Sequence, residues 1–210
     1  MNEKKIIIKR LGIKHWFDTF NDMHNFVSTS NKFTSDEIWF LEHYSIFTIG
    51  RSKNKIIDKK INYINGISVA NSDRGGGITY HGPGQQIIYL LLNLKRRKIY
   101  PSRIILFISE IVINTLKEFS INGIFNKKNP GVYVDGKKIC SIGLRIKNGF
   151  SLHGFSLNID MDLSPFNYII PCGINGIEMT QMKNLNSNIV FNEVQSVLFK
   201  KFCYFNNFLL

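Results

Sequence analysis

The stretch of the chain most suggestive of chemistry is residues 73–86, where five glycines and one proline lie within fourteen residues. Glycine permits positive φ angles and lets a ligand approach the backbone closely. Arg74 and His81 place a fixed cation and a titratable ring beside this open backbone. A flexible linker favours serine and small polar residues, whereas arginine, tyrosine, histidine and proline stand among these glycines. The composition therefore predicts a ligand-binding loop, which we call the glycine-rich segment.

Covalent chemistry also needs a nucleophile, and the chain offers three thiols. Cys140 lies in an apolar, strand-like run and Cys203 lies between two aromatic residues, so both are expected to pack in the core. Cys172 stands between Pro171, which fixes φ, and Gly173, which frees it. A turn of this kind can expose a thiol and aim backbone N–H groups past it, as an oxyanion hole requires. These features favour Cys172 as the nucleophile.

A reactive cysteine needs a nearby cation or base, because the thiolate is the reacting form. Lys137 and Lys138 are adjacent on an expected strand, so their side chains point to opposite faces and only one of them can face the site. The sequence alone does not choose between them. The candidate partners for the thiol are His81, His153, Lys137, Lys138 and Arg74.

The elements that must position these groups follow from the periodicity of apolar residues. Helical spacing predicts helices over residues 14–28, 101–119 and 192–202. Alternating or β-branched runs predict strands over residues 4–10, 36–43, 46–49, 67–70 and 86–94. The last of these is nearly all apolar and is expected to be a buried central strand.

The strongest local pattern is Asp135-Gly136 between two strand-like runs, residues 131–134 and 137–146, which marks a tight hairpin. Asn148-Gly149 offers a second turn into residues 151–159. We therefore expect three antiparallel strands in series. Together with the helices, they predict an α+β fold in which helices pack on a mixed, largely antiparallel sheet.

Size and composition limit the possible functions. The 210 residues, 44% hydrophobic and 13% aromatic, suffice for one folded domain spanning residues 1–210. Three widely spaced cysteines argue against a disulfide framework, and no CxxC or HExxH motif supports a metal site. The N-terminus lacks a signal-peptide pattern and no apolar run is long enough to span a membrane, so we expect a cytoplasmic protein.

The formal net charge of +12 is compatible with nucleic acid, an anionic membrane surface or acidic protein partners. The chain is also rich in Ile, Asn, Lys and Phe, a bias that an AT-rich genome produces without any binding function. The densest basic stretch, residues 51–60, carries no interleaved aromatic residues and no nucleic-acid-binding signature. We expect it to be a solvated loop, and we expect no nucleic-acid or membrane partner.

Four blocks of the chain together resemble the signature of the lipoyl(octanoyl) transferase family. Blocks linked in family order are far more specific than any single motif. In sequence they are Arg74-Gly75-Gly76-x-x-Thr79-Tyr80-His81-Gly82-Pro83-Gly84-Gln85, then Gly131-Val132-Tyr133-Val134 with Lys138-Ile139-Cys140-Ser141-Ile142-Gly143, then His153-Gly154-Phe155-Ser156-Leu157-Asn158, and Pro171-Cys172-Gly173.

The resemblance implies a fold similar to the catalytic domain of biotin and lipoate ligases. It also implies transfer of an octanoyl group from octanoyl-acyl carrier protein to a lysine of lipoyl domains, those of 2-oxoacid dehydrogenases and of the glycine-cleavage H protein. The nucleophile falls on Cys172 and its partner on Lys138, and we expect a monomer without cofactor or metal. The implied substrate-contacting positions are Arg74, Gly75, Gly76, Gly77, Ile78, Thr79, Tyr80, His81, Ser141, Ile142, Gly143, Gly154, Phe155 and Ser156.

The expected mechanism is attack of the Cys172 thiolate on the donor thioester, followed by attack of the acceptor amine on the acyl-enzyme. Lys138 would serve either as a cation that stabilises the thiolate or as a neutral amine that takes protons. Ile78 and Tyr80 are expected to line a slot for the eight-carbon chain.

Three other functions compete with this interpretation. An ATP-dependent lipoate or biotin ligase on the same fold would form an acyl-adenylate and would need no cysteine. A papain-like hydrolase would pair Cys172 with His81 or His153 and turn over in water. A basic nucleic-acid-binding module is supported by net charge alone.

Overall fold

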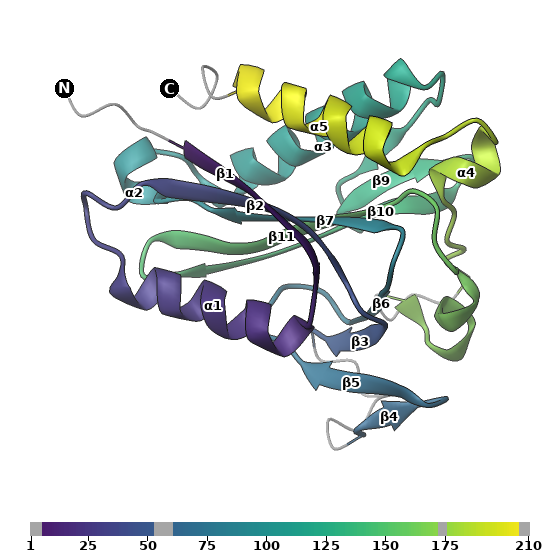
Figure 1. The fold of residues 1–210 in the computed structure, drawn as a ribbon, viewed down its shortest axis with the longest axis horizontal. Helices are drawn as coiled ribbons and strands as arrows, with labels where there is room; N and C mark the ends of the chain where they lie inside the picture. Colours follow the sequence, from purple (N-terminus) through teal and green to yellow (C-terminus); the bar gives the residue numbers. More distant parts are fainter. Residues whose placement is uncertain (1–5, 53–60, 172–175, 206–210) are drawn as a thin grey trace.

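Two β-sheets form the framework of the chain (Figure 1). In the computed structural model, which describes residues 6–52, 61–171 and 176–205, the larger sheet has seven strands and the smaller has four. In the larger sheet β1 and β2 are parallel, and the other neighbouring pairs are antiparallel. Its strands, in spatial order, are β1 (Ile6–Lys14), β2 (Asp36–His43), β7 (Gln85–Leu91), β11 (Phe150–Asn158), β10 (Lys137–Lys147), β9 (Gly131–Val134) and β8 (Ile124–Asn126).

The smaller sheet follows the end of β2, to which its strand β3 is joined by two residues. Within this sheet β3 runs parallel to β5 and antiparallel to β6. Its strands, in spatial order, are β4 (Tyr63–Ile64), β5 (Ile67–Asn71), β3 (Ile46–Ile49) and β6 (Ile78–His81).

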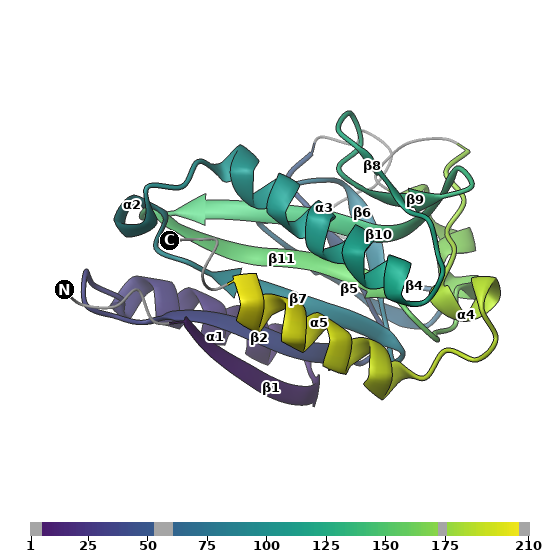
Figure 2. The ribbon, with the colours of Figure 1, turned by 90° about the horizontal axis from the view of Figure 1, so that it is seen from above.

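Helices cover both faces of the larger sheet. α3 (Pro101–Glu118) and α5 (Phe191–Phe205) lie together on one face, and α1 (Trp16–Thr29) lies on the other (Figures 1 and 2). No helix in the described part of the chain combines the length and the apolar character needed to cross a membrane. The shorter helical elements are α2 (Leu94–Arg97), η1 (Ser164–Tyr168) and α4 (Met182–Leu185).

The strand β7 lies inside the larger sheet, between β2 and β11, and is buried on both faces. Ile88 and Leu90 pack into the core beneath α3 and α5, while Ile87, Tyr89 and Leu91 pack toward α1. Because both faces are covered, the strand is apolar along most of its length instead of alternating with polar residues. The expectation of a buried central strand is therefore confirmed.

The strand expected over residues 86–94 ends earlier, at Leu91. The Asn93 side chain accepts a hydrogen bond from the backbone N–H of Arg96 at 3.0 Å and so caps α2. An N-cap of this kind satisfies a backbone donor that the first turn of the helix leaves unpaired.

The sequence suggested that the glycine-rich segment is one long loop, but part of it forms a strand. Residues Ile78–His81 form β6, which pairs with β3, and β7 begins at Gln85. Thr79 and Tyr80 favour extended backbone, and pairing with β3 supplies the hydrogen bonds that an isolated loop would lack.

The two expected hairpins are confirmed. Asp135 and Gly136 have φ angles of 49° and 78°, and Asn148 and Gly149 have φ angles of 52° and 82°. Two consecutive positive φ angles define the tight turn whose twist matches a β-hairpin. β9, β10 and β11 therefore run antiparallel in series, and the α+β class with a mixed, largely antiparallel sheet is confirmed.

Substitutions at Gly136 and Gly84 distinguish the cost of a strained backbone from the cost of a steric clash. A Cβ at Gly136 would meet nothing within 4 Å, whereas a Cβ at Gly84 (φ 83°) would lie 1.8 Å from the carbonyl oxygen of Asp160. We expect Gly136→Ala to lower the free energy of unfolding by about 1–2 kcal/mol, the cost of a left-handed conformation. Gly84→Ala should cost a further ~1–3 kcal/mol, because it also displaces packed backbone. Urea denaturation measures both, and equal losses would contradict the steric argument.

Candidate active site

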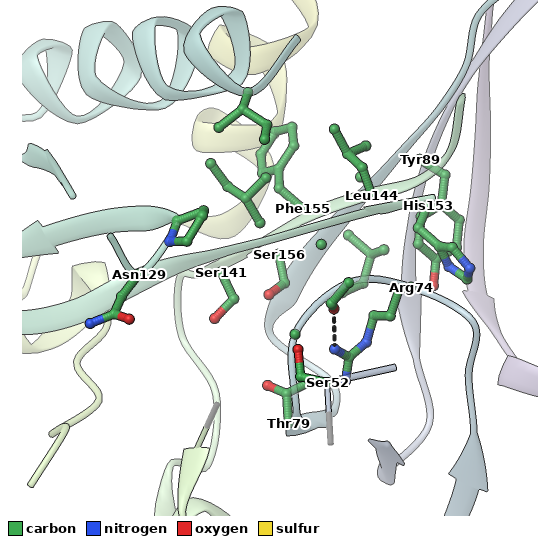
Figure 3. Close-up of a pocket in the computed structure, with 18 of the residues that line it drawn as sticks. Ser52, Arg74, Thr79, Tyr89, Asn129, Ser141, Leu144, His153, Phe155 and Ser156 are labelled. Carbon is green, nitrogen blue, oxygen red and sulfur yellow. Dashed lines mark hydrogen bonds between the residues drawn. The ribbon is translucent and has the colours of Figure 1, made fainter. Parts of the chain in front are cut away.

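A cavity of about 450 Å³ opens between the glycine-rich segment and the strands β10 and β11 (Figure 3). Phe155 and Leu144 lie along one side of it, and Arg74, Ser52 and Thr79 lie along the other. The volume is in the range of small-molecule sites. Of the residues expected to contact substrate, those that line the cavity are Arg74, Gly75, Gly76, Thr79, His81, Ser141, Ile142, Gly143, Gly154, Phe155 and Ser156, and Lys138 lines it as well.

The cavity exists because β10 loses its neighbour partway along its length. β9 pairs with β10 only as far as Ser141, opposite Gly131. Beyond that point the glycine-rich segment approaches instead, and the backbone N–H of Gly75 donates to the carbonyl oxygen of Leu144 at 3.0 Å. A Cβ at Gly143 would lie 3.1 Å from the carbonyl oxygen of Gly75, so a side chain at position 143 would push the two backbones slightly apart.

Strand alternation decides which residues of β6 reach the cavity. Thr79 and His81 face it, whereas Ile78 and Tyr80 pack on the opposite side, in a core cluster with Phe47. The apolar slot expected from Ile78 and Tyr80 is therefore built from other side chains. Gly77 likewise does not line the cavity, and the apolar lining comes from Ile142, Leu144, Ile146, Phe155 and Ile105.

Arg74 is held in a fixed position at the edge of the cavity. Its guanidinium donates to the Thr48 hydroxyl at 2.8 and 3.2 Å, to the Thr48 carbonyl oxygen at 2.7 Å and to the Gly75 carbonyl oxygen at 2.9 Å. A planar guanidinium with several donors engaged is oriented before any ligand arrives.

Lys138 is buried, with 2% of its surface exposed, although lysine is almost never fully buried. Gly131 leaves space beside it: a Cβ there would lie 2.4 Å from the Cys140 carbonyl oxygen and 2.6 Å from Lys138 Cε. The Nζ atom lies 5.5 Å from the centroid of the Tyr133 ring, within cation–π range. Lys137, in contrast, points outward and pairs with Glu178 at 2.6 Å. The structure thus resolves which of the two lysines lines the cavity.

The backbone of Lys138 also contacts the chain that follows Cys172. Its N–H donates to the Glu178 carbonyl oxygen at 2.8 Å, and its own carbonyl oxygen accepts from the Thr180 N–H at 2.9 Å. Cys172 itself lies outside the described residues, and its position as nucleophile remains a prediction.

The two described thiols lie elsewhere. Cys140 is fully buried, and burial raises the pKa of its thiol to about 12, against which the nearby Lys138 charge acts. A thiol in this state is not nucleophilic near neutral pH. Cys203 is exposed on α5 and does not line the cavity.

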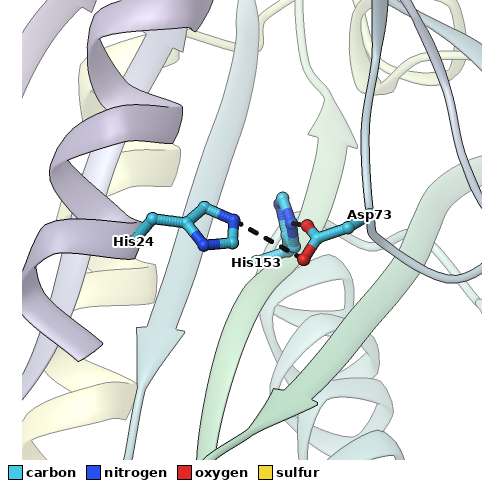
Figure 4. Close-up of side chains that lie close together, drawn as sticks. All are labelled: His24, Asp73 and His153. Atoms are coloured by element: carbon cyan, nitrogen blue, oxygen red, sulfur yellow. Dashed lines mark hydrogen bonds and ion pairs between the residues drawn. The ribbon is translucent and has the colours of Figure 1, made fainter. Parts of the chain in front are cut away.

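One group of described residues, His24, Asp73 and His153, has the spacing of metal ligands, with ligand atoms all within 4.8 Å (Figure 4). His153 Nε2 lies 2.7 Å from Asp73 Oδ1, and His24 Nε2 lies 3.5 Å from Asp73 Oδ2. However, Arg145 Nε lies 3.8 Å from the same carboxylate and Lys147 Nζ lies 3.3 Å from His24 Nδ1. Cations this close repel a metal ion. We interpret the cluster as a clamp that ties the glycine-rich segment to β11 and α1.

The charges in this clamp follow from burial and pairing. Burial lowers the pKa of His153, although the hydrogen bond to Asp73 and its negative charge act to raise that pKa. Burial alone would raise the pKa of Asp73, but its contacts with His153 and His24 hold that pKa below its usual value. The carboxylate is therefore ionised and accepts the Nε2–H of a neutral His153 ring. His153 also has a φ angle of 59°, which places a left-handed residue inside β11.

Several residues that line the cavity carry no local sequence signal. Trp16 belongs to α1, Ile105 to α3, and Asn129 to the turn before β9. They reach the cavity only through tertiary packing. Leu144 and Ile146 are different, because they continue the alternation set by Ile142 on β10 and the sequence contained that signal.

Two buried histidines make stability depend on pH. Burial lowers the pKa of His81 to about 3, helped by His43 and Arg74, and burial lowers the pKa of His43 to about 4. Both rings stay neutral in the folded protein, whereas the unfolded chain takes up a proton on each below about pH 6.5. The free energy of unfolding should therefore fall as pH decreases from about 6.5 toward 4, by roughly 1.4 kcal/mol per pH unit for each ring.

His43→Gln removes one of these rings. We expect the variant to lose about 2 kcal/mol less of its stability than the wild type between pH 7 and pH 5. Urea denaturation at the two pH values measures the difference, with His15→Gln, a substitution of an exposed ring, as the matched control. Parallel pH dependence in wild type and His43→Gln would show that His43 is protonated in the folded state.

Comparison with known proteins agrees with this geometry. The family model of the lipoyl protein ligase A/B catalytic domain matches residues 19–203. An octanoyltransferase of Buchnera aphidicola subsp. Acyrthosiphon pisum is 51% identical over 205 residues, which cover 98% of this chain and 96% of that protein.

Solved structures share the fold at lower identity. A lipoate-protein ligase A with bound ATP has a TM-score of 0.72 at 16% identity, covering 94% of this chain and 83% of that one. A biotin protein ligase from Aquifex aeolicus, with biotin and ATP, has a TM-score of 0.56 at 14% identity, covering 97% of this chain and 71% of that one. The expected likeness to biotin and lipoate ligases is confirmed at the level of the fold. With the family match and the identity to the Buchnera enzyme, the chain belongs to the lipoyl(octanoyl) transferases of the lipoyl protein ligase A/B catalytic-domain family.

Proposed function

We propose that this octanoyltransferase carries its acyl group as a thioester on Cys172 and delivers it to the lysine amine of lipoyl domains. The observation that carries the proposal is the buried Lys138, which lines the cavity and is hydrogen-bonded through its backbone to Glu178 and Thr180, a few residues after Cys172 in the sequence. A buried amine can promote thiolate formation in a thiol that comes within its reach, and this is the role proposed for Lys138 toward Cys172.

In the first proposed step, the donor is the thioester octanoyl-acyl carrier protein. The Cys172 sulfur, having lost its proton, forms a bond to the thioester carbonyl carbon. The bond to the carrier sulfur then breaks, and that sulfur leaves as a thiolate and takes up a proton. One thioester replaces another, so the exchange is close to balanced in energy and needs no ATP.

In the second proposed step, the acceptor lysine attacks the acyl-enzyme carbonyl carbon through its neutral amine. The carbon–sulfur bond to Cys172 breaks, the amine loses its extra proton, and the thiol is regenerated. The product amide is more stable than the thioester, which drives the transfer forward. Lys138 would support both steps, either by stabilising the thiolate as a cation or by accepting protons as an amine.

The apolar side chains of the cavity would hold the octanoyl chain. Ile142, Leu144 and Ile146 of β10, with Phe155 and Ile105, supply the apolar part of the lining. At about 0.8 kcal/mol per buried methylene, an eight-carbon chain would gain roughly 5 kcal/mol of binding free energy there. The same burial would exclude water from the thioester.

The partners in this proposal are proteins. The donor is acyl carrier protein, and the acceptors are the lipoyl domains of 2-oxoacid dehydrogenases and the glycine-cleavage H protein. A chain of net charge +12, with Lys128 at the cavity, suits acidic partners. The proposal also has the enzyme acting as a monomer in the cytoplasm, without cofactor.

Incubation of the protein with octanoyl-acyl carrier protein, without acceptor and without ATP, should add one octanoyl group to Cys172. Peptide mass spectrometry locates the adduct. Cys172→Ser should abolish it, while Cys203→Ser, a matched change of an exposed thiol on α5, should leave loading unchanged. An adduct on another cysteine, or loading that requires ATP, would overturn the proposal in favour of a different nucleophile or of a ligase.

Replacement of Lys138 tests its role in that loading step. Lys138→Met keeps the length and apolar stem of the side chain and removes the amine. Loading at neutral pH should fall by roughly 10²–10⁴-fold, the usual contribution of a positioned acid–base group. The deficit should shrink as pH rises toward the ordinary thiol pKa of about 8.5, because the thiol then ionises unaided. Lys137→Met, on the exposed neighbour, is the matched control, and equal rates in the two variants would remove Lys138 from the mechanism.

A further inference from the structure

A buried chain of hydrogen bonds connects the two sides of the cavity. It starts at Arg74, whose guanidinium donates to the Thr48 hydroxyl. Because that oxygen already accepts from arginine, its own hydrogen is directed to His81 Nε2 at 3.3 Å. His81 must then carry its proton on Nδ1, which lies 2.7 Å from Gln85 Oε1.

Two side-chain amides carry the chain onward. Gln85 Nε2 donates to Asn158 Oδ1 at 2.8 Å, and Asn158 Nδ2 donates to the Thr180 carbonyl oxygen at 2.9 Å. Each donor meets an acceptor in one consistent direction, which fixes the orientation of both amides. Hydrogen bonds aligned in this way polarise and strengthen one another.

The series of hydrogen bonds ends at the backbone of Lys138. The Thr180 N–H donates to the Lys138 carbonyl oxygen at 2.9 Å, and the Lys138 N–H donates to the Glu178 carbonyl oxygen at 2.8 Å. Residues 178–180, to which Asn158 is hydrogen-bonded, therefore pair with both the N–H and the carbonyl oxygen of Lys138. In the sequence, Thr180 follows Cys172 by only eight residues.

Gln85 and Asn158 are each 1% exposed, on the adjacent central strands β7 and β11. Side-chain amides at such depth cost free energy unless every polar atom finds a partner. An apolar pair of similar volume would fill the same space without that requirement. What the amides add is a directional connection between Arg74 and Lys138, which apolar packing cannot supply.

We propose that Gln85 and Asn158 are positioning residues of the acyl transfer, which hold Lys138 and residues 178–180 in register with the arginine side of the cavity. The inference rests on the proposed function, because it assumes acyl loading on Cys172. It concerns residues that touch neither the cavity nor the acyl group and act through Thr180 and Lys138.

Asn158→Leu and Gln85→Leu interrupt this series of hydrogen bonds at its centre, and each leaves the side-chain volume nearly unchanged. Octanoyl loading of Cys172 should fall by roughly 10–100-fold in each, as small displacements of reacting groups usually cost. Gln86→Leu is the matched control. Gln86 is also fully buried, but its amide bonds to Leu41, Ile87 and Gln195, outside this chain of hydrogen bonds. Its loading rate should stay within about twofold of the wild type, because no residue of the loading machinery moves.

Asn158→Asp separates positioning from loss of folding. A protonated carboxyl can still donate to Thr180 and accept from Gln85, whereas the ionised form faces the Thr180 carbonyl oxygen without a hydrogen. Burial raises the pKa of a carboxyl, so the protonated form dominates at low pH. The ratio of the variant's loading rate to that of the wild type should therefore fall as pH rises. A constant ratio would overturn the positioning role.

Amide hydrogen exchange gives a readout that does not depend on Cys172 chemistry. In Asn158→Leu, the N–H groups of Thr180 and Lys138 should exchange faster than in the wild type, while those at the centre of β7 keep their protection. If the wild type acquires no octanoyl group on Cys172, the proposed function fails. If the wild type loads normally and Asn158→Leu, folded by circular dichroism, loads and exchanges as the wild type does, this inference alone fails.

Discussion

The site depends on a close approach of two backbones. β10 is paired on both sides up to Ser141, and beyond that residue its free edge receives the Gly75 N–H instead of another strand. A side chain at position 143 would crowd this approach, because its Cβ would lie 3.1 Å from the Gly75 carbonyl oxygen. A normal strand at this edge would fill the space with its own side chains. The cavity is therefore the volume left where a sheet edge is closed by glycines.

Polar and apolar groups are divided between the two sides of this cavity. Beyond Ser141 the β10 side is apolar, while the β6 side and the adjoining loop carry Arg74, Thr79 and His81. Burial keeps His81 neutral, so the fixed charge at this side is that of Arg74, whose guanidinium is oriented by Thr48. Pre-oriented charge of this kind needs no rearrangement when a polar thioester or amine arrives.

Patterns that depend on neighbouring residues were readable from the sequence, and patterns that depend on tertiary packing were not. The Asp135-Gly136 turn was predictable because its positive φ angles are a local requirement. β6 was not predicted, because the glycines around it indicated a loop and the strand forms only by pairing with β3. The three-residue strand β8 was missed for the same reason, since it exists through its pairing with β9. Lys138 could not be separated from Lys137 until the fold showed which face was covered.

The buried position of Lys138 uses space that a glycine on the neighbouring strand leaves open. Its aliphatic stem occupies the space that a side chain at position 131 would need, with Cε only 2.6 Å from where the first carbon would stand. A side chain at position 131 would take room from Lys138 and would also lie 2.4 Å from the Cys140 carbonyl oxygen, which belongs to the backbone. In related chains, loss of the lysine at the position of Lys138 should therefore leave the glycine at the position of Gly131 in place, because the backbone contact alone still requires it.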